Sequence, residues 1–352
     1  MSSLIQRKTA TLITLTKSNE YREFTSITSI PNNVTCIGVD AFRGCSNLVT
    51  IVIPNSVTKI RKQAFYECIG LKSVVIPDSV TSIGAQAFFG CSGLTSIVIP
   101  NSITIVSRQT FDGCTGLTSA LIPDSTTIIE DSAFRECSGL TSIEIPDSVT
   151  SIGGKAFCGC SNLVSVRISN SATSIGYRAF YGCSRLISIV IPASVTMIDV
   201  GVFRGCSELI SIEIPDSVAS INTGAFRGCF GLTSVIIPNS VTSIGDRAFE
   251  DCRRLTSIVI PDSVISIGEG TFRGCTGLTS IVIPDSITRV INDVFRECTG
   301  LISVVIPDTV TYIGSSTFRS CNQLEQVIAP ARFHHLFPGV VSVTEPTQYL
   351  LK

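Results

Sequence analysis

Cysteine is the side chain in this sequence with the greatest capacity for chemistry, because 15 of the 352 residues are cysteines. Thirteen of them recur every 23 residues, from Cys45 to Cys321, and each follows a phenylalanine by three positions. No two have the Cys-x-x-Cys spacing that is typical of zinc sites. Identical positions in a regular series are packing positions, and a free thiol behaves as a small, readily buried hydrophobe. We therefore expect thirteen buried thiols rather than disulfides or metal ligands, which favours a reducing compartment.

Two cysteines, Cys36 and Cys158, fall outside this series. Both occupy positions that we expect to face solvent. Exposed thiols are the ones that react, so these two are the candidate reactive cysteines. The alternative is that each is an ordinary surface residue.

The histidines are few: the sequence contains only His334 and His335, near its C-terminal end. They could serve as a metal pair or a base, or could lie in an exposed turn, and no partner follows at metal-ligand spacing. Catalysis requires different side chains that converge on one point, whereas this sequence repeats the same ones. The sequence therefore predicts no enzyme, no cofactor and no metal site.

The elements that position these side chains are copies of one 23-residue repeat. Thirteen phenylalanines, from Phe42 to Phe318, follow one another in steps of 23 with no insertion or deletion. Self-similarity with a period of about 20–50 residues indicates stacked repeats. We predict one domain of thirteen repeats over residues 31–329.

A single copy shows how the repeat folds. Within Leu94–Ile99 apolar residues alternate with polar or exposed ones, which predicts a strand with one buried face. Pro100 has no N–H to donate and ends that strand. Residues 80–83 predict a second short extended segment, and residues 87–91 a single short helical turn that buries Phe88 and its neighbours.

Three motifs together resemble the BspA-like class of leucine-rich repeats: L-x-x-I-x-I at Leu94–Ile99, F-x-G-C at Phe88–Cys91 and I-P-D-S-V-T-S-I-G at Ile76–Gly84. The resemblance covers residues 31–329. It implies an α/β repeat fold: a right-handed leucine-rich-repeat solenoid of thirteen 23-residue coils, with a long parallel sheet and short helical turns. It also implies a role as a microbial surface adhesin or interaction module.

The two ends of the sequence depart from the repeat. We predict that residues 1–30 form an N-terminal cap and residues 330–352 a C-terminal cap, because an open stack must not expose its core at its ends. Within the second cap, the apolar residues 349–351 (Tyr349, Leu350 and Leu351) are expected to cover the end of the phenylalanine column.

The N-terminus has no basic segment followed by an apolar core, so it predicts no signal peptide. No apolar run approaches the roughly 18 residues of a spanning helix, so no membrane insertion is expected. We expect a cytoplasmic protein, and surface display stays open if the sequence belongs to a longer chain. A net charge of −1 with 15% charged residues gives no electrostatic reason to propose a nucleic acid partner.

The outward positions of the predicted strands form the candidate interaction face. A continuous stripe of exposed apolar side chains is typical of interaction surfaces, although β-branched residues are also simply favourable in strands. The candidate residues are Val98, Leu121, Glu144, Arg167, Val190, Glu213, Ile236 and Val259.

Three charged residues, Glu144, Arg167 and Glu213, interrupt this stripe. Glu144 and Arg167 lie at the same position in adjacent copies and could form an ion pair. The charges could mark a specific contact, or could prevent association between exposed sheets.

Three polar series offer other interpretations. The aspartates after the prolines, such as Asp78, could bind Ca²⁺ or make ordinary turns. The arginines after the phenylalanines, such as Arg135, could form an anion-binding strip or a solvated edge. A Ser-x-Thr array, such as Ser79 with Thr81, could bind ice or a polysaccharide, or consist of normal strand residues.

The sequence as a whole predicts a non-catalytic leucine-rich-repeat protein that mediates protein–protein interaction or adhesion through its sheet face. The alternative is a carbohydrate- or ice-binding solenoid that uses the Ser-x-Thr array, so a protein partner is expected and a glycan partner stays open.

Overall fold

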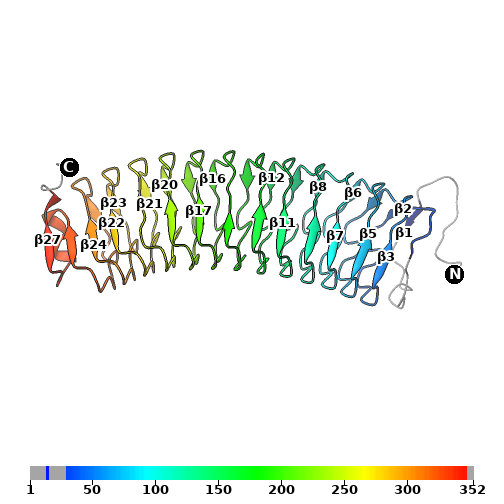
Figure 1. Cartoon of the computed structure of the whole chain (residues 1–352), viewed down its shortest axis with the longest axis horizontal. Helices are drawn as coiled ribbons and strands as arrows, with labels where there is room; N and C mark the ends of the chain where they lie inside the picture. Colours follow the sequence, from blue (N-terminus) through cyan, green and yellow to red (C-terminus); the bar gives the residue numbers. More distant parts are fainter. Residues whose placement is uncertain (1–12, 16–28, 347–352) are drawn as a thin grey trace. The chain divides into compact units, whose positions relative to one another are not determined.

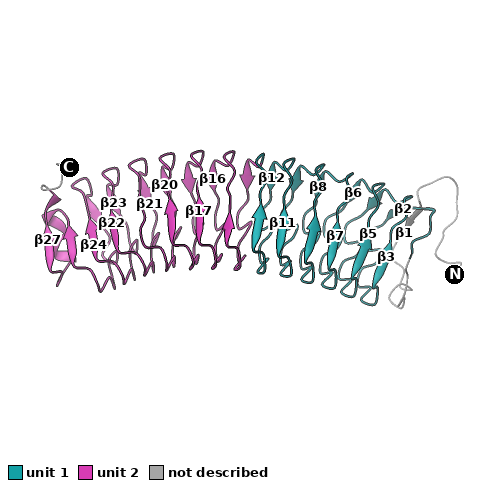
Figure 2. Cartoon of the chain, in the orientation of Figure 1, with its two compact units in different colours: residues 1–171 teal, residues 172–352 magenta. Residues whose placement is uncertain are grey.

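A computed structural model describes residues 13–15 and 29–346 of the chain. Its internal contacts divide the chain into two compact units, residues 1–171 and 172–352 (Figure 2). Each unit is a parallel-sheet β-solenoid built from coils of 23 residues, and most coils contribute one strand to each of two ladders (Figure 1). The repeat fold expected from the sequence is therefore confirmed within each unit.

Unit 1 contains two sets of short parallel strands. The first set consists of the strands that the L-x-x-I-x-I motif predicted: β3 (Thr50–Val52), β5 (Ser73–Val75), β7 (Ser96–Val98), β9 (Ser119–Leu121), β11 (Ser142–Glu144) and β13 (Ser165–Arg167). The second set consists of β1 (Ile13–Leu15), β2 (Val34–Ile37), β4 (Lys59–Ile60), β6 (Ser82–Ile83), β8 (Ile105–Val106), β10 (Ile128–Ile129) and β12 (Ser151–Ile152).

Unit 2 repeats the same arrangement. Its first set consists of β15 (Ser188–Ile189), β17 (Ser211–Glu213), β19 (Ser234–Ile236), β22 (Ser280–Val282), β24 (Ser303–Val305), β26 (Gln326–Ile328) and β27 (Ser342–Thr344). Its second set consists of β14 (Ser174–Ile175), β16 (Met197–Ile198), β18 (Ser220–Ile221), β20 (Ser243–Ile244), β21 (Ser266–Ile267), β23 (Arg289–Val290) and β25 (Tyr312–Ile313).

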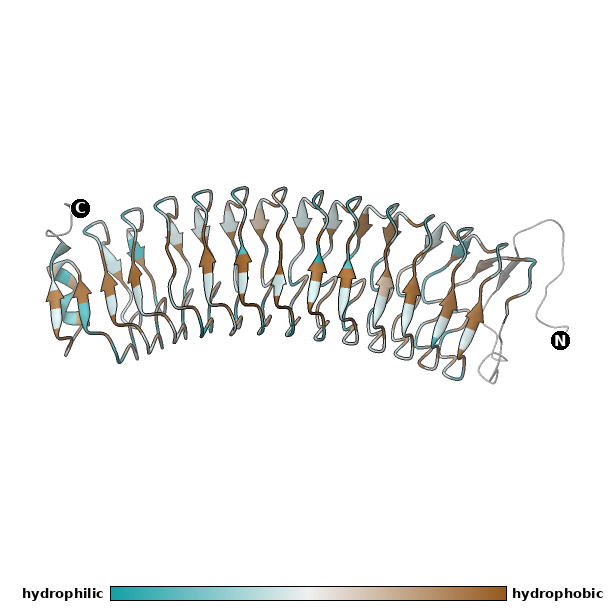
Figure 3. Ribbon diagram, in the orientation of Figure 1, coloured by the Kyte–Doolittle hydropathy of each residue, from teal (hydrophilic) through white to brown (hydrophobic). Residues whose placement is uncertain are grey.

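The register of the strands turns the repeat into columns of identical side chains. Strand β7 pairs with β9 so that Val98 lies beside Leu121, 23 residues later. In most three-residue strands of the first set the middle residue is buried and its neighbours are exposed; Ile97, for example, is 2% exposed. Figure 3 shows most strands of the first set pale at their start and hydrophobic further along, because a serine is followed by two apolar residues.

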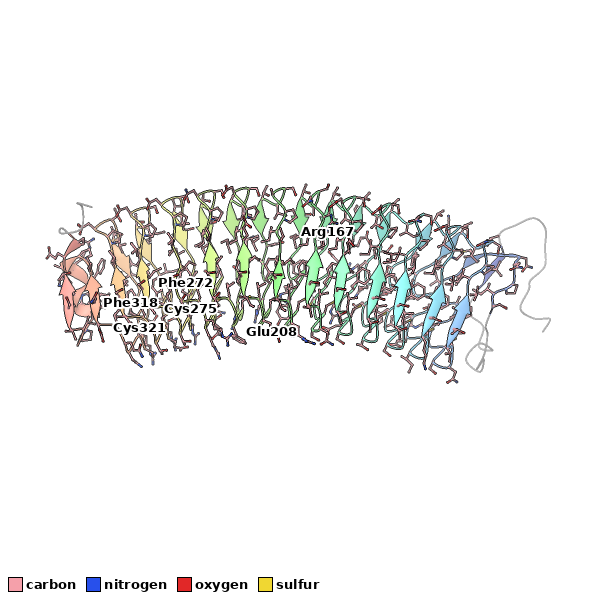
Figure 4. The ribbon with its side chains drawn as sticks, viewed as in Figure 1. Arg167, Glu208, Phe272, Cys275, Phe318 and Cys321 are labelled. Carbon is pink, nitrogen blue, oxygen red and sulfur yellow. The ribbon has the colours of Figure 1, made fainter. Side chains whose placement is uncertain are left out.

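The phenylalanines form the centre of the core in each unit. In unit 1 the rings of Phe65 and Phe88 are parallel, with centroids 5.0 Å apart, and in unit 2 the rings of Phe226 and Phe249 lie 5.2 Å apart. Three successive phenylalanines of the 23-residue series in unit 2, Phe226, Phe249 and Phe272, are completely buried. Phe272 with Cys275, and Phe318 with Cys321 two coils later, show how the pair recurs (Figure 4).

The thiols behind the phenylalanines are buried, as expected, except for the half-buried Cys321. Eleven of these thiols, such as Cys68 and Cys252, donate a hydrogen bond to the carbonyl oxygen of the phenylalanine one coil earlier, with sulfur–oxygen distances from 3.0 Å at Cys68 to 3.4 Å at Cys252. This bond, which the sequence pattern did not predict, explains why a weak donor recurs at this position.

The helical turn predicted for residues 87–91 is wrong. These residues form hydrogen-bonded turns, and the one helix in the described residues is the 3₁₀ helix η2 (Ala331–Leu336). Gln86 and Gly90, on either side of Phe88, have φ angles of 61° and 68°. An α-helix requires consecutive residues with φ near −63°, so two left-handed residues within five positions exclude it.

The turn adopts this conformation because it bonds to the next coil. The N–H groups of Gln86, Phe88 and Gly90 donate to carbonyl oxygens of residues 108, 110 and 112 at 2.7–3.0 Å. The N–H groups of the residues between them donate to the carbonyl three positions earlier and so close four-residue turns within the same coil. The bonds to the next coil make this segment a third ladder, although it is neither a helix nor a strand. Each backbone N–H of the turn has a partner, so the irregular conformation leaves no buried donor unpaired.

The C-terminal end of unit 2 differs from the repeated coils. Strand β27 pairs in parallel with β26, and the ring of Phe337 packs against Phe318 with centroids 5.2 Å apart and planes tilted by 52°. Phe337 therefore covers the phenylalanine column, a role that the sequence analysis assigned to residues 349–351, which lie outside the described residues. The boundaries of the two caps stay predictions.

Candidate interaction face

The candidate face in unit 1 is the row of outward side chains at the last residue of each strand in the first set. Val75, Val98 and Leu121 are each about 60% exposed, which is high for large apolar residues. Glu144 and Arg167 continue the row on β11 and β13, where the register places them side by side. Each side chain points outward because its strand buries the preceding residue.

In unit 2 the apolar side chains at the same position have larger exposed fractions. Val190 is 71% exposed, Ile236 80% and Val259 78%. Glu213 lies between Val190 and Ile236, and single parallel bridges join Val190 to Glu213 and Ile236 to Val259. Both units therefore present apolar rows that contain charged residues.

The ion pair predicted between Glu144 and Arg167 is confirmed, and it has a third member. One terminal nitrogen of Arg167 lies 3.2 Å from the Glu144 carboxylate and the other lies 3.0 Å from the Asp147 carboxylate. The Arg167 guanidinium, together with the backbone N–H of Asn170, lowers the pKa of Asp147. All three side chains are well exposed, so the cluster contributes little to stability.

A shallow groove with a volume of about 480 Å³ runs beside the row in unit 1. It lies where the strands of the first set end and the proline turns begin, and its lining includes Val98, Leu121, Asn101, Asp78 and Asp124. In the sequence, the apolar series and the aspartate series have separate interpretations. The structure brings them together, because only two residues separate each strand end from the next turn.

The two candidate reactive thiols are in fact buried, so the expectation of exposed cysteines is wrong. Cys36 is 5% exposed in β2, which has β1 and β4 on its two sides. Cys158 is 8% exposed, at the position that follows the phenylalanine. The same position is buried in two other coils, where Asp112 is 2% exposed and Glu250 is 5% exposed. Burial of this kind protects thiols from reagents.

The histidines lie at the C-terminal end of unit 2. His334 is half-buried, with Nε2 2.9 Å from the carbonyl oxygen of Ala329, and His335 is exposed. Within residues 13–15 and 29–346 no three His, Cys, Asp or Glu side chains are placed to hold a metal ion. The hydrogen bond of His334 is a structural contact that joins η2 to the preceding strand.

The Ser-x-Thr array forms hydrogen bonds within the solenoid. Thr81 Oγ1 donates to the carbonyl of Thr58 at 3.2 Å, and Ser79 Oγ donates to that of Val57 at 2.8 Å. The same bonds recur in neighbouring coils. The hydroxyl protons are therefore used to join coils, which gives the array a structural role.

The other two polar series also have internal partners. Asp78 and Asp147 accept the backbone N–H of the residue at the same position one coil later, as turn residues commonly do. Arginines of the third series form ion pairs: Arg135 lies 3.4 Å from Asp112, and Arg227 lies 2.7 Å from the buried Glu250. Carboxylates therefore pair with several arginines of this series.

Comparison with known proteins gives the same fold. A family model described as a BspA type leucine-rich repeat region matches residues 17–141, 127–256 and 242–342. No curated protein matches the chain. Within the described residues, no helix has the length and hydropathy needed to cross a membrane.

Two solved structures are similar in sequence and fold. A leucine-rich cell surface protein from Faecalibacterium prausnitzii A2-165 is 30% identical over 90% of both chains, with a TM-score of 0.53. A leucine-rich repeat protein from Bacteroides ovatus is 27% identical over 90% of this chain and 91% of its own, with a TM-score of 0.57. The pneumococcal vaccine antigen PcpA, 20% identical with a TM-score of 0.64, shares the fold.

Proposed function

Because this chain belongs to the BspA-type leucine-rich repeat family, we propose that it is a non-catalytic binding protein that holds a protein partner on its sheet face. The observation that supports the proposal most strongly is the exposure of Val98, Leu121, Val190, Ile236 and Val259, each 60–80% exposed. Exposed large apolar side chains lower their free energy when a partner covers them.

The arrangement of side chains favours binding over catalysis. Identical residues stack at intervals of one coil, about 5 Å, so each column offers an extended strip rather than a point where a nucleophile, a base and an oxyanion donor converge. Such a strip suits an extended contact with a macromolecule. The glycan or ice platform has less support, because the Ser-x-Thr hydroxyl groups already donate to backbone carbonyls.

We also propose that the protein is displayed at a cell surface, in place of the cytoplasmic location expected from the sequence. The similar protein from F. prausnitzii is described as a cell surface protein, and adhesion requires an outward location. The fifteen thiols are compatible with this location because all but Cys321 are buried, away from oxidants.

A capture experiment with matched variants tests the proposal. The test variant carries Val98→Lys, Val190→Lys and Val259→Lys. The control carries Thr81→Lys, Thr150→Lys and Thr242→Lys, which add the same charge at exposed positions of the second ladder. Proteins captured from cell-surface and extracellular extracts by the wild type and the control should be lost from the test variant. Identical capture by all three proteins would refute the proposal.

A further inference from the structure

We propose that the groove in unit 1 binds lysine or arginine side chains of a partner protein, with their apolar stems on Val98 and Leu121 and their charged ends at Asp78 and Asp124. This inference rests on the proposed function, because it states which kind of protein segment the sheet face selects. It concerns residues of unit 1 alone.

The apolar part of the groove is a pair of neighbouring side chains. Val98 and Leu121 are paired in the β7–β9 ladder and each is 60% exposed. The methylene stems of lysine and arginine pack on such surfaces while the charged ends stay in water. Valine and leucine therefore provide a platform for the stems.

The charged part consists of two exposed carboxylates that have no cationic partner. Asp78 and Asp124 lie two coils apart, about 10 Å by strand spacing, on either side of Asn101. One oxygen of Asp78 accepts the backbone N–H of Asn101 at 3.1 Å, which fixes the carboxylate at the rim. Neither aspartate forms an ion pair with any residue that the structure describes, and no lysine or arginine lines the groove.

The next aspartate of the same series shows the contrast. Asp147 forms an ion pair with Arg167, which also forms one with Glu144. The two carboxylates of the groove are not balanced by a cation and together contribute a charge of −2. Further along the row, Arg167 pairs with the carboxylates and should not attract a second cation. Complementary charge of this kind selects partners and accelerates their association. The volume of about 480 Å³ lies within the range of roughly 300–1,000 Å³ that is common for binding pockets.

Peptide binding to the full chain tests the inference. Three labelled heptapeptides, Gly-Lys-Val-Lys-Val-Lys-Gly and its versions with serine or glutamate at the lysine positions, are titrated by fluorescence anisotropy. The lysine peptide should bind, more weakly as salt increases. The serine and glutamate peptides should bind at least several-fold more weakly.

The variants assign the binding to the groove. Asp78→Asn with Asp124→Asn should weaken binding of the lysine peptide roughly 3- to 10-fold, as expected for two exposed ion pairs. The chain itself carries asparagine at this position in Asn55 and Asn101, so the fold tolerates the change. The control Asp147→Asn, whose carboxylate is already paired, should leave the affinity within about twofold.

Different failures have different meanings. If the double variant binds the lysine peptide as well as the wild type does, the inference is wrong. If the serine peptide binds equally well and Val98→Ser with Leu121→Ser abolishes that binding, the sheet face binds without selecting charge. In that case the inference fails while the proposed function stands.

Discussion

The thiol of Cys91 lies 3.1 Å from the carbonyl oxygen of Phe65 and joins two successive coils of the core. The same carbonyl accepts the N–H of Cys68 in its own coil, so it holds one bond within a coil and one between coils. The sulfur also fills space beside the stacked rings. Cysteine therefore recurs here because it is small, apolar enough for a dry core and able to donate one hydrogen bond.

Cys91→Ala should lower the free energy of unfolding by about 1–2 kcal/mol, because it removes buried atoms and the bond between coils. Cys321→Ala should cost less, since Cys321 is half-buried and solvent can replace its sulfur. Urea denaturation measures both. Equal losses would mean that burial does not determine the contribution of this column.

The thiols should react slowly in the folded protein. Burial raises the pKa of Cys275 to about 12, which reduces its thiolate fraction at pH 8 about a thousandfold relative to a free cysteine. Cys36 and Cys158 should be protected by their enclosure. Iodoacetamide labelling with mass spectrometry, with and without urea, measures this. Rapid labelling of Cys158 in the native protein would show that its position opens to solvent.

Asp112 should make unit 1 less stable as pH rises through the mildly acidic range. Burial raises its pKa above the usual 3.8, and this effect outweighs the attraction of Arg135 at 3.4 Å. The folded state then binds more protons than the unfolded state, so the contribution of Asp112 is full below pH 3.8 and is lost as pH rises through the folded pKa.

Asp112→Asn removes this dependence. The stability of the variant minus that of the wild type should therefore increase between pH 3.5 and 7 in a series of urea titrations. A difference that does not change with pH would contradict the assignment.

Asp147 should behave in the opposite way. The Arg167 guanidinium holds the pKa of Asp147 below 3.8, so the ion pair persists above that value and is lost only as pH falls through the lower, folded pKa. Carboxyl carbon chemical shifts in an NMR titration measure this. Arg167→Gln should raise the pKa of Asp147, whereas an unchanged pKa would mean that the N–H of Asn170 alone sets it.

Substitution of two phenylalanines in unit 2 compares the contribution of a stacked core ring with that of a surface ring. Phe226 is completely buried between Phe203 and Phe249, at centroid distances of 5.5 and 5.2 Å, so Phe226→Ala should cost about 3–5 kcal/mol. Phe230, four residues later, is 42% exposed, and Arg253 lies 4.7 Å from its ring centroid. Phe230→Ala should cost less than about 1 kcal/mol. Similar costs in denaturant melts would be evidence against the stacked column as the core.

Some features could be predicted because each coil repeats the same local pattern. Alternation around Ile97 predicted the strand, and the series that contains Cys91 and Phe88 predicted inward columns. The pairing of Glu144 with Arg167 followed from their common position in adjacent copies. Each of these inferences needs only the period and the alternation.

The helical turn could not be excluded from sequence, because buried residues at 87, 88 and 91 have the spacing of a helix face. The left-handed conformations of Gln86 and Gly90 arise from bonds to the next coil, which local propensity does not include. The burial of Cys158 likewise depends on how the position after each phenylalanine is enclosed in the turn.

The sequence by itself determined the repeat fold. A strict 23-residue period gives every coil the same inward apolar positions, and coils can bury these side chains only when they stack in register. Only the tertiary structure decided which polar groups remain available. Hydrogen bonds between coils occupy the hydroxyl protons of Ser79 and Thr81, and Arg167 pairs with Asp147. Asp78 and Asp124, beside Val98 and Leu121, form no ion pair with the residues that the structure describes. Those differences depend on contacts between coils, and a repeat that is nearly identical along the chain does not reveal them.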